Sequence, residues 1–134
     1  MQLQIFFTLY AISVPLFFII DMLWIGFIAR KFYIEQIGYL MGDVRWIAAI
    51  TFYLIFILGL TFFATYPAAT KGTVLTAIVM GGLFGFFTYA TYDLTNLATV
   101  RSWPLTLTIV DIAWGTVLGA LVSGLAVFIR SMFV

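Results

Sequence analysis

Residues 89–114 read YATYDLTNLATVRSWPLTLTIVDIAW, and this stretch is far more polar than the chain around it. It holds two carboxylates, Asp93 and Asp111, together with Asn96 and Arg101, although 65% of the chain is hydrophobic and only 8% is charged. A soluble domain has about 25% charged residues, so the composition predicts a protein that lives in a bilayer. The two acids therefore belong to membrane segments, where they need a partner, water or a function.

Four apolar segments surround and include this stretch, and each is long enough to cross about 30 Å of hydrocarbon as a helix. Their connections are short, so neighbouring helices are antiparallel and both termini lie on one side. The predicted fold is an all-α bundle of four transmembrane helices that forms a single domain, 1–134. We expect the spans at about 3–29, 44–66, 73–97 and 103–129, with Tyr66-Pro67 ending the second.

The segment between the first two spans, KFYIEQIGYLMGD at 31–43, is too short and too polar to cross a membrane. It has an apolar helical face and a polar face that holds Lys31, Glu35 and Gln36. This pattern fits a short amphipathic helix at the membrane surface, and it equally fits a plain connecting loop. The apolar face consists of Tyr33, Ile34, Ile37, Leu40 and Met41.

Basic residues at the span ends predict the orientation of the bundle. Four of them, Arg30, Lys31, Arg45 and Arg101, lie at the first and third loops. Two, Lys71 and Arg130, lie at the other side. Because cytoplasmic loops carry the excess of basic residues, loops 30–45 and 98–102 are expected in the cytoplasm and both termini outside.

The residue types that are missing narrow the chemistry. The chain has no Cys and no His, so it lacks thiolate chemistry, the commonest metal ligand and the commonest general base near neutral pH. We therefore expect no metal site and no cofactor. The net charge of +1 also predicts no nucleic-acid partner.

Three acids are expected at one depth in the bilayer. Asp21 is nine residues before Arg30, Asp93 eight before Arg101, and Asp111 ten after Arg101. At 1.5 Å per residue, each lies roughly 12–15 Å from the same membrane face. The first and fourth spans also share an Asp-x-x-Trp pattern, which resembles the inverted repeats that build midplane sites in transporters. Since those helices are antiparallel, we expect the two Trp side chains to point to opposite sides of the acid layer.

An acid near the bilayer centre costs about 2.5–3.5 kcal/mol, so these carboxyls are either protonated or face a polar cavity with donors. We favour a cavity open toward the basic face, with Arg45 and Arg101 at its rim reaching inward. Its ligand-binding residues are predicted to be Asp21, Trp24, Tyr89, Tyr92, Asp93, Asn96, Asp111 and Trp114. Other aromatic residues at the span ends, including Tyr33, Trp46 and Trp103, are interpreted as interfacial anchors.

Glycines on the third and fourth spans repeat at four-residue spacing, as Gly81/Gly85 and Gly115/Gly119. This small-residue pattern lets helix backbones approach closely. We expect it to pack the third span against the fourth, with a homo-oligomer seam as the alternative.

Three functions fit these features. In the first, the site binds or transports a small polar or cationic solute, and this binding or transport can be coupled to protons. Alternatively, the protein is an accessory or an enzyme in membrane-lipid modification, with the acids acting as general acid and base or holding a divalent cation. In the third alternative the bundle is a structural scaffold and the acids only join its helices. Whether the protein is an enzyme is left open.

The block 81–119, GGLFGFFTYATYDLTNLATVRSWPLTLTIVDIAWGTVLG, together with Asp21-x-x-Trp24, resembles the domain of unknown function 2177 family. This is a family of small bacterial inner-membrane proteins. The resemblance covers essentially the whole chain and implies four spans in the bacterial inner membrane, among membrane lipids, with no established activity. Genes of the family are said to lie near those of fatty-acid-modifying enzymes of the cyclopropane-synthase type, which implies an association with lipid metabolism.

Overall fold

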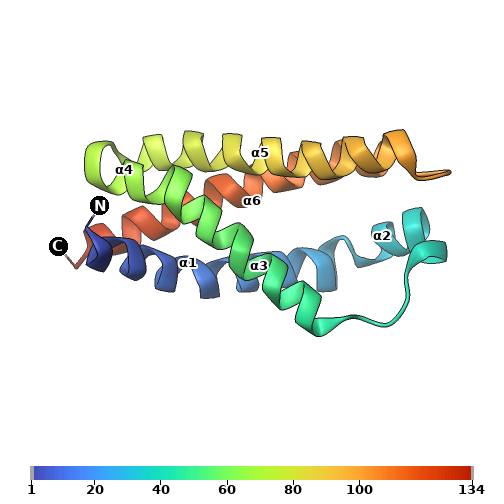
Figure 1. Cartoon of the computed structure of the whole chain (residues 1–134), viewed down its shortest axis with the longest axis horizontal. Coiled ribbons are helices and arrows are strands. Elements are labelled where there is room, and N and C mark those ends of the chain that lie inside the picture. The colour runs from blue at the N-terminus through green and yellow to red at the C-terminus, as the bar shows by residue number, and fades with distance from the viewer. Residues whose placement is uncertain (1, 134) are drawn as a thin grey trace.

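The computed structural model of the chain describes residues 2–133 and contains four long antiparallel helices (Figure 1). All four are long and apolar enough to cross a membrane, which confirms the predicted four-helix membrane bundle. No strand occurs within residues 2–133. The candidate spans are Leu3–Ile28, Trp46–Lys71, Val74–Thr99 and Leu105–Ser131.

The first two spans are each built from more than one helical segment. A π-helical segment, Trp24–Ile28, continues α1, and another, Thr61–Thr65, joins α3 to α4. A 3₁₀ turn, Gly38–Leu40, follows the short helix α2. The α-helices are α1 (Leu3–Leu23), α2 (Arg30–Ile37), α3 (Trp46–Leu60), α4 (Tyr66–Lys71), α5 (Val74–Thr99) and α6 (Leu105–Ser131).

The second span does not end at Tyr66-Pro67, so that prediction is wrong. The helix runs on to Lys71, with Pro67 in the first turn of α4. Pro lacks an N–H and normally breaks the helical ladder, but the π-helical segment just before it shifts the hydrogen bonding and resets the helix. The turn to α5 is consequently shorter than expected, and Thr73 caps α5 by accepting a hydrogen bond from the backbone N–H of Thr76.

Helices α5 and α6 are in backbone contact through their glycines. A Cβ atom added at Gly85 would collide with the carbonyl oxygen of Gly115, and one added at Gly81 would collide with that of Gly119. The expected packing of the third span against the fourth is therefore present. These four glycines form their contacts within one chain, where they let two helices lie closer than side chains would permit.

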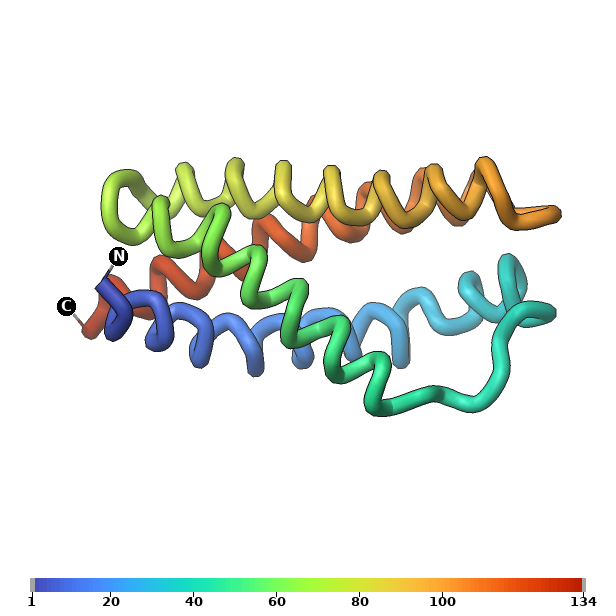
Figure 2. The backbone as a smooth tube through the Cα atoms, in the orientation of Figure 1, coloured from blue at the N-terminus to red at the C-terminus, as the bar shows by residue number. Residues whose placement is uncertain are grey.

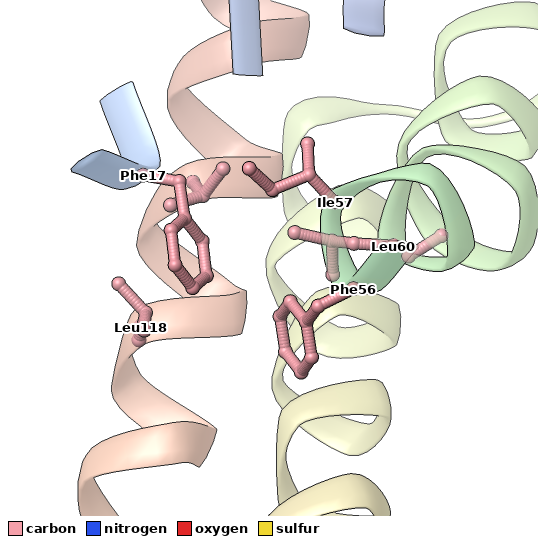
Figure 3. Packing of buried hydrophobic residues seen from close by; sticks show 7 residues of the cluster. Phe17, Phe56, Ile57, Leu60 and Leu118 are labelled. Atoms are coloured by element: carbon pink, nitrogen blue, oxygen red, sulfur yellow. The ribbon is translucent and has the colours of Figure 1, made fainter. Parts of the chain in front are cut away.

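Two apolar clusters fill the bundle from its middle toward the termini, and the one nearer the termini consists of Leu9, Ala68, Ala77 and Val127. Figure 3 shows Phe17 from α1, Phe56, Ile57 and Leu60 from α3, and Leu118 from α6 packed together. Phe17, Ile57, Leu60 and Leu118 are completely buried. This half of the bundle is thus solid.

The other half is more open because α3 crosses the bundle obliquely (Figures 1 and 2). Near α4 it lies beside α5, and it diverges from α5 toward the end that holds α2. Both described chain ends lie together at the opposite end of the bundle. The divergence of α3 leaves room for a cavity between the helices.

The glycine contact predicts that the stability cost of a Gly→Ala substitution depends strongly on its position along α5. We expect Gly85→Ala to destabilise the bundle by roughly 3 kcal/mol, because the methyl group must push α5 off the Gly115 carbonyl. Gly82→Ala is the matched control, since its Cβ would meet nothing closer than Ala120 Cβ at 3.5 Å. Unfolding of both variants in detergent, followed by circular dichroism, measures the difference. Equal stability of the two would contradict the close α5–α6 contact.

Candidate functional site

A cavity of about 430 Å³ lies in the open half of the bundle, among α1, α2, α3, α5 and α6. Its wall carries two carboxylates, Asp21 and Asp111, and no basic residue. Seven of the lining residues are aromatic, so the acids sit in a mainly apolar and aromatic surrounding. The lining residues are Asp21, Ile25, Tyr33, Ile37, Met41, Phe52, Tyr53, Phe56, Thr88, Tyr89, Tyr92, Asp111 and Trp114.

Asp21 is held by donors from two other helices. Its carboxylate accepts a hydrogen bond from the Tyr53 hydroxyl of α3 at 2.8 Å and another from Trp114 Nε1 of α6 at 3.0 Å. The residue is 1% exposed. Two hydrogen bonds offset much of the cost of placing a carboxylate away from water, and they also tie α1 to α3 and α6.

The hydrogen bond to Asp111 comes from α2, which lies outside the four spans. Its carboxylate accepts a hydrogen bond from the Tyr33 hydroxyl of α2, and that hydroxyl accepts one from Trp24 Nε1 at 3.1 Å. Burial raises the pKa of Tyr33 far above its usual range, and the hydrogen bond to Asp111 raises it further. Tyr33 therefore stays protonated and remains a donor at physiological pH.

Asp93 is completely buried and lies outside the cavity wall. Within residues 2–133 no hydroxyl or N–H group donates to either of its carboxyl oxygens. The carboxyl group of Asp111, on the facing helix α6, lies close to it. Asp93 and Asp111 therefore form a close carboxyl pair at the α5–α6 contact.

The two Trp side chains do not point apart. The rings of Trp24 and Trp114 stack with centroids 4.3 Å apart and an interplanar angle of 7°. The shared Asp-x-x-Trp pattern thus brings the two indole rings into contact between the first and fourth spans.

Five of the ten predicted site residues line the cavity: Asp21, Tyr89, Tyr92, Asp111 and Trp114. Asp93 and Trp24 stand directly behind this wall. Asn96 is half-buried and does not reach the cavity.

Arg45 and Arg101 do not donate to the acids, contrary to our expectation. Both are exposed, and neither forms an ion pair within residues 2–133, where Lys31–Glu35 at 3.7 Å is the one salt bridge. Tyrosine hydroxyls and an indole N–H replace them, since these groups donate without adding a charge to a buried site. The guanidinium groups remain at the end of the bundle.

Sequence reasoning missed the two tyrosines that donate to the acids. Tyr33 was interpreted as an interfacial anchor, but its four-residue spacing with Ile37 and Met41 already marked one face, and all three line the cavity. Tyr53 had no such signal, because Thr51, Thr61 and Thr65 place other hydroxyls in the same apolar span. The apolar lining residues Ile25, Phe52 and Phe56, as well as Thr88, were likewise indistinguishable from ordinary lipid-facing or core residues.

The segment around Tyr33 contains a short helix, and its place at a membrane surface stays a prediction. α2 covers Arg30–Ile37 and turns Tyr33 and Ile37 toward the cavity, while Ile34 is half-exposed. No group of three or more His, Cys, Asp or Glu side chains that could hold a metal occurs in the described part of the chain.

The fold and the cavity together define a small integral membrane protein of four spans with a carboxylate-bearing cavity inside the bundle. The family model described as "Predicted membrane protein (DUF2177)" matches residues 6–128. The chain belongs to this family, as the resemblance in residues 81–119 indicated. Comparisons with curated proteins and with solved structures found no significant match.

The Tyr33 hydrogen bond predicts that α2 is anchored to the bundle. We expect Tyr33→Phe to loosen residues 30–45 by about 1–3 kcal/mol, because Asp111 loses a donor in a buried site. Hydrogen–deuterium exchange of α2 measures the loss of protection. Tyr66→Phe, at the far end of the bundle, is the matched control. Unchanged exchange of α2 in Tyr33→Phe would show that the bond does not anchor it.

Proposed function

We propose that this protein binds a small organic cation inside the bilayer, at Asp21 and Asp111. The observation that carries the proposal is a cavity with two carboxylates, no basic residue and a wall of aromatic rings. A cation near aromatic faces gains about 0.5–2 kcal/mol per ring, and aromatic cages recognise quaternary ammonium groups in this way. An anion would meet two carboxyl groups with no basic residue beside them.

The geometry favours binding over a channel. Phe56 lies at the inner wall of the cavity and also belongs to the packed core beyond it. A solute at Asp21 therefore meets a solid half-bundle between itself and the end that carries the termini. Transport through the chain would require α3 to move relative to α1 and α6.

The binding is expected to be linked to protons. We infer that the close carboxyl pair of Asp93 and Asp111 shares one proton, because no hydroxyl or N–H group of residues 2–133 donates to Asp93, and that a cation which pairs with Asp111 competes with this proton. Asp93 lies behind the wall, so its role is to supply that proton and not to contact the cation.

The proposal predicts selectivity for charge at constant shape. We expect the purified protein to bind benzyltrimethylammonium at least about ten-fold more tightly than its uncharged isostere neopentylbenzene, a difference of 1.4 kcal/mol. Isothermal titration calorimetry in buffers of different ionisation enthalpy measures both the affinity and the proton release.

Asp21→Asn and Asp111→Asn should each abolish this preference for the cation, because Asn keeps a hydrogen-bonding side chain but loses the charge. Asp43→Asn, at an exposed position, is the control. If the acids were only structural, both Asn variants would bind like the wild type. Equal binding of the cation and its neutral isostere would contradict the proposal.

We also propose that the protein lies in the bacterial inner membrane with α2 in the cytoplasm and both termini outside. The support is the excess of basic residues at the α2 end, where Arg30, Lys31, Arg45 and Arg101 lie.

Because the chain has no Cys, single cysteines can report this orientation. In intact spheroplasts, a membrane-impermeant maleimide should label Ser131→Cys and leave Gly42→Cys unlabelled until the cells are lysed. Both positions are exposed. The reverse labelling pattern would invert the proposed orientation.

A further inference from the structure

We propose that the ligand enters sideways from the bilayer, between α3 and α5, and is a single-chain amphiphile. Its cationic head group reaches Asp21 and Asp111, and its apolar tail remains in the gap between the two helices. The cationic head rests on the proposed function, whereas the lateral entrance rests on geometry of its own.

The end of the cavity at α2 is covered. The Tyr33 hydroxyl of α2 donates to Asp111, and the Tyr39 hydroxyl donates to the Ser102 carbonyl oxygen at 2.8 Å. These two bonds fasten α2 and the following 3₁₀ turn to α6 and to the loop between α5 and α6. Ile37 of α2 and Met41, which follows the 3₁₀ turn and is 56% exposed, form part of the cavity wall. A solute that arrives along the bundle axis from this end meets a tied-down cap.

The opposite end is closed by the core. Phe56 lines the cavity, and Phe17 packs against it with ring centroids 5.3 Å apart. Leu118 is completely buried in the same cluster (Figure 3). An entrance along the axis of the bundle is thus obstructed at both ends.

The side between α3 and α5 is open. Phe52 of α3 and Tyr92 of α5 both line the cavity, yet they are 53% and 59% exposed. Such residues form the edge of an opening, and α3 diverges from α5 at this place (Figure 1). Each lies six or seven residues inside its span, which is about 10 Å from the helix end at 1.5 Å per residue. The opening therefore faces acyl chains and not water.

The residues at the edge of the opening are apolar or aromatic, whereas the inner wall carries the acids. The exposed lining residues are apolar or aromatic: Phe52 and Tyr92 at the opening, and Ile25 of the first span, which is 40% exposed. The acids lie deeper, and Asp21 is 1% exposed. This order matches a molecule that carries a charged head on an apolar tail. At about 30 Å³ for each water-sized group, the cavity of about 430 Å³ holds roughly fourteen non-hydrogen atoms, enough for a head group and the first part of one chain.

Contact quenching of a single tryptophan tests the lateral entrance. The protein that keeps only Trp114, made by Trp24→Phe, Trp46→Phe and Trp103→Phe, is placed in nanodiscs of phosphatidylcholine with dibrominated acyl chains. Bromine quenches tryptophan only at short range. We expect strong quenching of Trp114, although the ring is half-buried inside the bundle, and recovery of fluorescence when dodecyltrimethylammonium displaces the acyl chain.

Matched variants and probes make the test specific. Thr88→Phe narrows the opening and should reduce the quenching, whereas Thr91→Phe, one turn further along α5 at an exposed position outside the cavity wall, should not. Equal Trp114 fluorescence in brominated and unbrominated lipid would overturn lateral entry, even if benzyltrimethylammonium still binds. Quenching that dodecanol relieves as well as dodecyltrimethylammonium would overturn the cationic head group and leave the entrance standing.

Discussion

The buried carboxylate of Asp21 is the constraint on which the arrangement of the helices depends. A carboxylate in a bilayer is tolerated only when donors surround it, and here they come from Tyr53 on α3 and Trp114 on α6. One residue of α1 thereby determines the position of two other helices. Trp114 then stacks on Trp24, whose indole donates to Tyr33. The chain of contacts runs without a break from α1 to α2.

A second constraint, the contact between α5 and α6, brings the other two acids together. Gly81, Gly85, Gly115 and Gly119 let these helices meet backbone to backbone. At that separation Asp93 and Asp111 face each other and the Tyr89 ring covers Gly115. Helix α3 takes no part in this close contact. It crosses the bundle obliquely instead, and the cavity is the space that results.

The sequence predicted the four spans well and the side-chain contacts between them poorly. The four spans followed from apolar length, and intramembrane acids marked the site because such residues are expensive. Hydropathy does not report which side chains of two helices meet, so the stacking of Trp24 on Trp114 was missed. Hydropathy also does not identify the hydrogen-bond donors, because Tyr33 and Tyr53 look like anchor and core residues until their hydroxyls are placed. The second helix continues through Pro67 because of a π-helical segment that no local sequence pattern indicated.

In the proposed function the cavity holds a positive charge between Asp21 and Asp111. Crystals grown with para-bromobenzyltrimethylammonium can show this charge in place, since the bromine can be located by its anomalous scattering. We expect one bromine peak beside Phe56 or Tyr89, with the ammonium group between the two carboxylates. A bromine peak elsewhere on the protein, or none at a saturating concentration of the ligand, would contradict it.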